Sequence, residues 1–472
     1  MLKHFPKYFS NSSMQIYFIG VIVCLIVFMK YSMEWFFYFF GAISVLGFFY
    51  FFNQLSISWK NISEKKFIRK VFFTALILRI IWVVFSYHFF VMQTGRPFDW
   101  GAADAVGYNE CGTEIAAELR TGNFAVFSDY QALFGVSDLG YMSYLGILYS
   151  FTGDSMMIAR LFKALYGALM CLLLYRLAAR NFGESTGRMA GIMCMLMPNF
   201  IYYCGLHLKE AEMVFITVAF VERADYLLRG RKFNFINITI PLLLSISLFF
   251  FRTVLGITAL MSFFTAIVFS SVKVIGWGKR ILVGVWLVAV IGFFLGGKIA
   301  SEVEEIWEER SVNQEKSMAY RAGHKGGNQF AKYGTTAIFA PMIFTIPFPS
   351  VTSFEEGMVS GQLMLNGGNY VKNITSFFTI LGIFLLIFRK KWRENLLILS
   401  FLVGYLGIIA MSAFAMSERF HYPSVPFALI IAAYGISQMD EQKRKYFNWW
   451  TIFMFFAIIG WSWFKLAGRG II

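Results

Sequence analysis

Charged residues are scarce in this chain, and so are proline and cysteine. Only 15% of its 472 residues are Asp, Glu, Lys or Arg, whereas an ordinary soluble domain carries about 25%. Hydrophobic residues make up 58% and recur in long blocks from residue 14 to residue 466. This composition excludes a soluble multidomain protein and predicts one polytopic membrane unit.

Several familiar sequence signatures are missing as well. The chain has no Walker loop, no dinucleotide glycine fingerprint, no HExxH and no GxSxG, which disfavours ATP-driven transport and the common hydrolase mechanisms. The first apolar block, "MQIYFIGVIVCLIVFMK", lacks a small-residue cleavage site, so we expect it to remain as a span. The five cysteines show no metal-type spacing. Cys111 and Cys204 are expected near one membrane face, where a disulfide between them is one alternative.

Lysine and arginine concentrate in short loops between the apolar blocks. The net charge of +15 therefore does not indicate nucleic acid, and no nucleic-acid partner is expected. Every second loop between the predicted spans is basic, and short basic loops of membrane proteins face the cytoplasm. This alternation predicts a cytoplasmic N-terminus and an outer C-terminus. By analogy, a chain without a large soluble domain is expected in the bacterial cytoplasmic membrane. The basic loops hold Lys60, Lys65, Lys66, Arg69 and Lys70; Arg176, Arg180 and Arg188; Arg229, Arg231 and Lys232; Lys273, Lys279 and Arg280; Arg389, Lys390, Lys391 and Arg393; and Lys443, Arg444 and Lys445.

The predicted fold class is all-α, a polytopic transmembrane helix bundle of about 13 helices with helices in its extracytoplasmic loops. The predicted spans are 14–30, 33–52, 67–92, 156–178, 187–204, 209–228, 235–251, 254–272, 281–297, 373–388, 395–413, 419–437 and 447–466. The chain then divides into two extra N-terminal helices (1–66), a core (67–297) with a first external loop (93–155), a second external loop (298–372) and C-terminal helices (373–472).

The second external loop is polar and rich in glycine, with two exceptions. Residues 301–316, "SEVEEIWEERSVNQEK", predict an acidic helix at the membrane surface. Residues 335–349 are apolar but carry three prolines, so they predict a dip or a surface segment rather than a span. Any chemistry is therefore expected at the outer face, in the loops and the helix ends around them.

Acidic residues gather where the chain leaves the first core span, in "FDWGAADAVGYNECGTEIA" (98–116). Asp104 has two readings: an N-cap for a helix predicted over 108–120, or a general base or metal-linked carboxylate in an external cavity. Partial shielding from water raises the pKa of a carboxyl group, which suits a base. Asp99 is a secondary candidate for the same role as Asp104.

Several cations are expected at the outer face, where basic residues are otherwise depleted: Arg160, Lys209, Arg252 and Arg419. Together they indicate a site for an anion. Each also has a plainer reading. Lys209, Glu210 and Glu212 could form a solvated helix start, and Arg252, Arg419 and His421 could anchor helix ends at the interface. Arg79 lies midway along its span and must pair or face the bundle interior.

These residues resemble the GT-C superfamily of integral membrane glycosyltransferases, in particular the protein O-mannosyltransferase and aminoarabinose-transferase-like families. The resemblance is carried in order by "DAVGY" with Asp104 and Tyr108, by a span opened by Arg160 with "LAARNFG" and a later Lys-Glu, by "FFFRT", and by "ERFHYPSVPFALIIAAYG". It covers roughly residues 67–270 and 415–437. Two features depart from the family: Ala105 stands where many relatives have a second acid, and two spans precede the usual first helix.

The resemblance implies a donor in which a polyprenyl phosphate carries the sugar, and an acceptor hydroxyl on a lipid, glycan or protein. Asp104 would be the base, and Glu210 would orient the acceptor or a divalent cation held with Asp104. The phosphate would be held by Lys209, Arg252 and Arg419, with Arg160 and His421 in support, while Tyr108 and Asp99 would contact substrate. Membrane lipids would surround the enzyme.

Two other functions are open at this point. An O-antigen polymerase or ligase also uses a carrier lipid, but it would place paired arginines in a large external loop. A secondary transporter or flippase would show inverted internal repeats, and no repeat is evident between the halves.

Overall fold

The chain folds entirely into helices and connecting turns over the part described by the computed structural model, which covers residues 2–230, 235–295, 340–353, 361–411 and 417–467. Within these residues the only β-type pairing is an isolated bridge between Ser32 and Thr352. The first helices are α1 (Lys7–Val27), α2 (Trp35–Ser58), α3 (Glu64–Thr94), α4 (Ala103–Arg120), α5 (Val126–Phe134), α6 (Leu139–Thr152), α7 (Met156–Phe182), α8 (Glu184–Leu196), α9 (Pro198–Tyr202) and α10 (Glu210–Arg229). They are followed by α11 (Phe235–Phe251), α12 (Thr253–Phe269), α13 (Trp277–Leu295), α16 (Asn366–Phe388), α17 (Leu396–Ala410), α18 (Glu418–His421), α19 (Val425–Ser437) and α20 (Glu441–Ala467).

Six helices among the described residues are long and apolar enough to cross a membrane: α1, α2, α3, α7, α16 with the turn before it, and α20. Three shorter apolar helices, α11, α12 and α17, accompany them. A helix satisfies its own backbone hydrogen bonds, which is the condition for crossing lipid. These helices indicate a multi-pass membrane protein, and the expected all-α class is confirmed. The count of about 13 spans stays a prediction.

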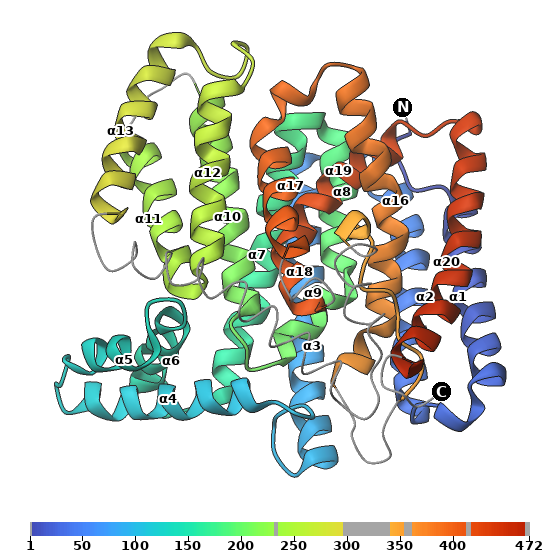
Figure 1. Cartoon of the computed structure of the whole chain (residues 1–472), viewed down its shortest axis with the longest axis horizontal. Coiled ribbons are helices and arrows are strands. Elements are labelled where there is room, and N and C mark those ends of the chain that lie inside the picture. The colour runs from blue at the N-terminus through green and yellow to red at the C-terminus, as the bar shows by residue number, and fades with distance from the viewer. Residues whose placement is uncertain (1, 231–234, 296–339, 354–360, 412–416, 468–472) are drawn as a thin grey trace.

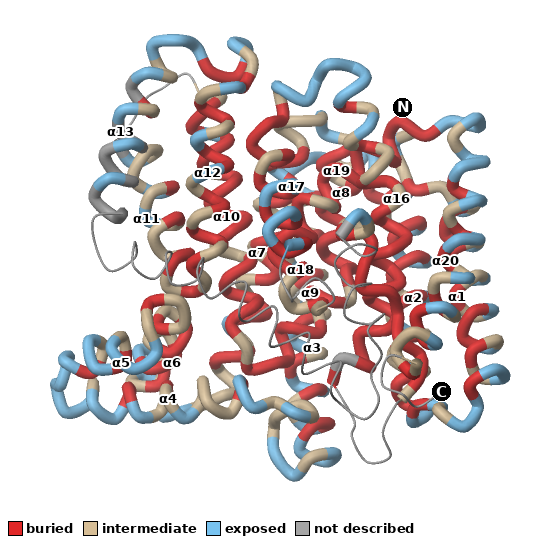
Figure 2. Tube along the Cα trace, in the orientation of Figure 1, coloured by how far each residue is buried: buried red, intermediate tan, exposed pale blue. Residues whose placement is uncertain are grey.

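The outer helices carry their apolar residues on the surface. Large side chains such as Ile26 on α1, Val285 on α13 and Phe456 on α20 are more than half exposed. Figure 2 shows buried residues concentrated in the central helices, with exposed positions along the outward faces of α1, α13 and α20. A bundle with an apolar exterior around a packed interior suits a lipid environment.

The predicted span over 187–204 is wrong as a single helix, because the chain breaks at Pro198. Helix α8 ends at Leu196 and the short α9 begins at Pro198, which has no N–H to donate to the carbonyl of Cys194. The buried guanidinium of Arg79 supplies donors instead. It donates to the carbonyls of Cys194 at 3.2 Å and Met195 at 3.3 Å. The midspan arginine therefore caps a broken helix.

The segment 93–155, predicted as the first external loop, forms three packed helices, α4, α5 and α6, which extend sideways from one end of the bundle (Figure 1). The helix expected over 108–120 begins earlier, at Ala103. The alternative of a disulfide between Cys111 and Cys204 is not realised, because both thiols are free. Cys111 packs beside α5 and α6, whereas Cys204 donates to the carbonyls of Phe200 and Lys163.

The segment predicted as the second external loop ends earlier than residue 372, because α16 begins at Asn366 rather than near residue 373. The acidic stretch 301–316 lies outside the described residues. Of the segment 335–349, predicted as a dip or a surface segment, residues 335–339 lie outside the described residues. Residues 343–351 are mostly buried without forming a long helix, and side chains of α16 bind them. Ser376 donates to the carbonyl of Phe344 at 2.6 Å, and Asn373 donates to that of Pro347 at 3.2 Å.

Contacts between the basic loops bring them together at one end of the bundle. Arg188 donates to the carbonyl of Trp59 at 2.7 Å, and Arg393 donates to that of Phe269 at 3.0 Å. Lys279 donates to the carbonyl of Gly230 at 2.9 Å. Figure 1 shows the turn between α7 and α8 at the end away from α4. The basic loops therefore lie together at the end of the bundle away from α4 (Figure 1).

Candidate functional site

Arg419 lies at the centre of a polar cluster at the α4 end of the bundle. Its Nε donates to Glu210 and its Nη1 to Asp104, so one guanidinium joins two carboxylates that are distant in sequence. Both acids lie in the first turn of a helix, where the helix dipole favours negative charge. The Glu210 side chain is fully buried, whereas that of Asp104 is 57% exposed.

The N-cap reading of Asp104 is wrong. The N-cap of α4 is Ala102, and no side chain caps the helix. The carboxylate of Asp104 instead pairs with Arg419 on α18, which follows it by more than 300 positions. The reading of Glu210 as part of a solvated helix start is also wrong, because the residue is buried and paired.

Arg252 supplies a second cation to the same carboxylate. Its Nη2 lies 3.7 Å from Oε1 of Glu210, and its guanidinium lies 4.5 Å from the ring centroid of Phe420. The other terminal nitrogen of Arg252, Nη1, is buried without a hydrogen-bond partner among the described residues, as is Oε2 of Glu210. Buried polar atoms normally find partners. This part of the cluster therefore has unused hydrogen-bonding capacity.

Lys209 lies next to the cluster and pairs with Asp138, an acid that was not predicted as a site residue. Its ammonium pairs with Asp138, which also accepts a hydrogen bond of 2.9 Å from the hydroxyl of Tyr108. Burial opposes ionisation of Asp138, but the ammonium of Lys209 holds its pKa below the usual range. Asp138 precedes α6 in an ordinary "SDLG" turn, so nothing local in the sequence marks it as a partner of Lys209.

A cavity of about 220 Å³ opens beside Arg419 and Asp104. Asp99 also lines it, and burial raises the pKa of Asp99 to about 6, against the smaller opposing effects of Arg160 and Arg419. The lining residues are Asp99, Trp100, Gly101, Ala102, Asp104, Ala105, Tyr202, Tyr203, Leu206, Leu208, Gly361, Leu365 and Arg419. A pocket of this size with two carboxylates, a guanidinium and aromatic side chains can take a small polar ligand.

Arg160 is fully buried but lies outside the Arg419 cluster. It donates to the carbonyl of Pro97 and lies 5.6 Å from the ring centroid of Tyr87. Its Nε and Nη1 have no hydrogen-bond partner among the described residues. Because Pro97 precedes Asp99 by two positions, Arg160 supports the loop that carries Asp99.

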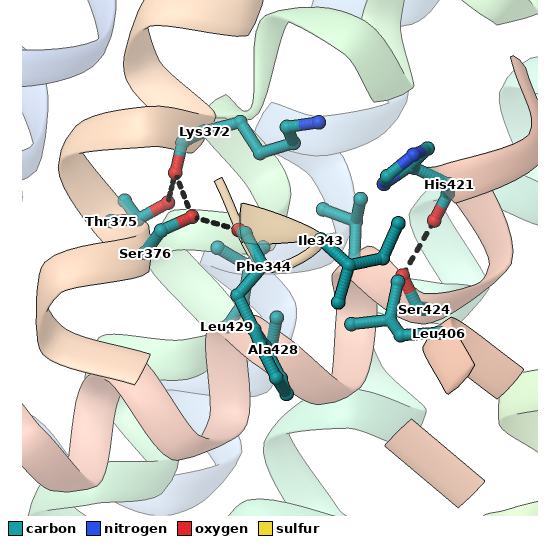
Figure 3. A pocket seen from close by; sticks show the side chains of 11 residues that line it. Ile343, Phe344, Lys372, Thr375, Ser376, Leu406, His421, Ser424, Ala428 and Leu429 are labelled. Atoms are coloured by element: carbon teal, nitrogen blue, oxygen red, sulfur yellow. Dashed lines mark hydrogen bonds between the residues drawn. The ribbon is translucent and has the colours of Figure 1, made fainter. Parts of the chain in front are cut away.

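His421 lines a different cavity from the one beside Asp104 and Arg419. It lines a smaller cavity of about 20 Å³ together with Lys372 and residues of α16 and α19 (Figure 3). The buried Lys372 lies 3.4 Å from Glu418 and donates to the carbonyl of Ile346 at 2.8 Å. Asn199 donates to the same Glu418 carboxylate at 2.6 Å. Lys372 therefore contacts both Glu418, which directly precedes Arg419, and the segment 343–351.

A second buried pair lies beneath the cluster. Lys163 and Glu212 are 3.1 Å apart, and Lys163 also donates to the carbonyl of Leu208, next to Lys209. His207 contacts the hydroxyl of Tyr149 at 3.1 Å, and burial lowers the pKa of His207 well below its usual value. Lys163 was not predicted as a site residue, although its spacing of three from Arg160 places both on one helix face.

The residues present do not suit the divalent cation that the resemblance allowed. The guanidinium of Arg419 contacts both Asp104 and Glu210, so a positive charge already joins these two carboxylates. The described residues contain no group of three or more His, Cys, Asp or Glu side chains arranged to hold a metal ion. We therefore derive no step through a metal.

The chain was also compared with known proteins. No protein-family model, characterised protein or solved structure matches it.

Proposed function

We propose that this protein is a GT-C-type membrane glycosyltransferase that moves a sugar from a polyprenyl-phosphate carrier to an acceptor hydroxyl. One observation supports the proposal most: Asp104, Glu210, Arg252 and Arg419 come from four separate elements and meet in one cluster beside a cavity. The sequence motifs of the resemblance contain all four of these residues.

The chemistry of the transfer matches the groups in the cluster. The carrier phosphate leaves with negative charge, and preorganised cations stabilise such a charge most effectively in a site shielded from water. Arg252, Arg419 and Lys209 would hold the phosphate, with Arg160 behind them. Glu210 would keep Arg252 and Arg419 oriented. A carboxylate of the first loop, Asp104 or its neighbour Asp99, would take the proton of the acceptor hydroxyl.

The position of the cluster fits an outward-facing site. It lies at the α4 end, whereas the basic loops meet at the other end (Figure 1). By the positive-inside rule the basic end faces the cytoplasm, which puts the site at the extracytoplasmic face. The proposed membrane is the bacterial cytoplasmic membrane, which the chain would cross with about 13 spans. The apolar helices would hold the carrier's lipid tail.

The test is a turnover assay with purified protein and a carrier loaded with a radiolabelled sugar. We expect release of free polyprenyl phosphate and appearance of the label on an added hydroxyl acceptor, both lost in Arg419→Met. A carrier bond that stays intact while the loaded carrier crosses vesicles would contradict the proposal and indicate a transporter. Transfer of a whole glycan chain would indicate a polymerase or ligase.

A further inference from the structure

Two carboxylates of the first loop, Asp99 and Asp104, line the same cavity in different surroundings. We propose that Asp99, and not Asp104, accepts the proton of the attacking hydroxyl, while Asp104 positions Arg419. This inference rests on the transfer reaction proposed above. It assigns the base of that reaction to a different residue from the one that the motif "DAVGY" indicates.

Asp104 is already engaged by a cation. Its Oδ2 accepts a charge-assisted hydrogen bond from Nη1 of Arg419, whose Nε binds Glu210. A proton delivered to Asp104 would weaken this pair, and Arg419 would lose one of the two carboxylates that orient it toward the leaving phosphate. Asp104 is also the more exposed of the two acids. Its geometry therefore suits a residue that aims Arg419.

Asp99 forms no ion pair within the described residues, and the backbone around it is well supported. The hydroxyl of Thr94 donates to the carbonyl of Phe98 at 2.9 Å, and Arg160 donates to that of Pro97. On another side Gly361 approaches so closely that an added Cβ would lie 2.4 Å from Oδ2 of Asp99. A carboxylate held by its surroundings and facing a cavity is preorganised for proton transfer.

The charged and titratable groups that face Asp99 come from three directions. Arg160 approaches from α7, Arg419 from α18, and the phenols of Tyr202 and Tyr203 from α9 and the turn after it. Burial outweighs a backbone hydrogen bond and the two cations, and raises the pKa of Asp99 to about 6. At neutral pH the carboxylate is thus ionised yet able to take a proton, as a general base requires.

The proposed step is balanced with the groups at hand. The acceptor oxygen forms a bond to the anomeric carbon, and the bond between that carbon and the phosphate oxygen breaks. The electron pair of the broken bond leaves on the phosphate, opposite Arg419 and Arg252. The hydroxyl proton passes to Asp99, which returns it to solvent before the next turnover.

Single-turnover rates of the wild type, Asp99→Asn and Asp104→Asn between pH 5 and pH 8.5 test the assignment, with carrier affinity measured separately. Asp99→Asn is expected to slow transfer by about 10²-fold or more with unchanged carrier affinity. The wild-type rate is expected to fall below pH 6, and Asp104→Asn to keep that fall while binding the carrier more weakly. Gly361→Ala, which crowds Asp99, is expected to slow transfer without weakening carrier binding.

The outcomes separate the two proposals. If the wild type transfers sugar and Asp99→Asn does so equally fast, the assignment of the base is overturned and the proposed function stands. The same holds if the fall below pH 6 disappears in Asp104→Asn but persists in Asp99→Asn. If the wild type releases no polyprenyl phosphate from any loaded carrier, both are overturned.

Discussion

The two ends of helix α10 carry acidic residues that the fold treats in opposite ways. At its start, Glu210 and Glu212 each keep one buried carboxylate oxygen without a hydrogen-bond partner among the described residues. Near its end, every carboxylate oxygen of Glu222 and Asp225 has a cationic partner. Glu222 binds Arg180 and Arg223, and Asp225 binds Arg180 at 2.9 Å and Arg229 at 2.8 Å.

The difference distinguishes a fully paired cluster from one that keeps unpaired polar atoms within the described part of the chain. A buried polar atom without a partner costs about 1–3 kcal/mol, so a fold that leaves several in one place loses stability there. Proteins accept such losses mainly at sites where a ligand completes the interactions. We infer that the cluster at the start of α10 binds a ligand: Nη1 of Arg252 can donate to an anion, and Oε2 of Glu210 can accept from a donor such as a hydroxyl. The cluster at the end of α10 instead holds α7 and α10 together.

Replacing one arginine at each end by methionine breaks the comparison most directly. Arg252→Met removes a cation that is weakly paired, so we expect sugar transfer to fall by about 10²-fold or more with a melting temperature within about 2 °C of the wild type. The turnover assay and a thermal melt in detergent measure the two effects. A variant that melts much earlier would mean that Arg252 is mainly structural.

The matched variant at the other end, Arg180→Met, should show the reverse pattern. Removing one partner of a buried ion pair costs about 3–5 kcal/mol, and less here because Arg180 is 24% exposed. We expect the melting temperature to fall by about 3–5 °C, while the turnover of each folded molecule is unchanged. Loss of turnover with an unchanged melting temperature would mean that the cluster at the end of α10, and not the one at its start, acts in transfer.

The pair between Lys372 and Glu418 is intermediate, since it is buried like the cluster at the end of α10 but adjoins Arg419. Lys372→Met leaves Glu418 without its cation, so we expect a loss of about 3–5 kcal/mol, lessened by the hydrogen bond that Asn199 still donates to Glu418, and roughly tenfold slower transfer. Adding Glu418→Gln removes the unpaired charge and should recover most of the stability. A double variant no more stable than Lys372→Met would show that the two residues act independently.

The smallest expected effect concerns Asp99 and pH. Its pKa of about 6 in the folded protein lies above its usual value of 3.8, so the folded state binds more protons than the unfolded state between these values. Stability therefore falls as pH rises through this range. Asp99→Asn should melt about 1–2 °C above the wild type at pH 8, with the gain shrinking toward pH 4. An equal gain at both pH values would exclude titration of Asp99 as its cause.

Long-range pairing marks the limit of what could be predicted. The motifs selected Asp104, Glu210 and Arg419, but no pattern within each segment indicated that one guanidinium would join the two acids. Asp138 and Lys372 were missed because each pairs with a residue at least 46 positions away. The break at Pro198 was missed because the apolar run continues through it, and only the donors of Arg79 show how the freed carbonyls are satisfied.

The sequence by itself determined the all-helical class, a membrane environment and the separation of a basic end from the rest. These follow from composition and from the spacing of apolar runs, which act locally along the chain. The tertiary structure alone decided which charges meet, which stay without partners and which carboxylate faces the cavity. Those outcomes depend on how helices pack against one another, because burial and distance set the energy of a charge, and neither is a property of a segment.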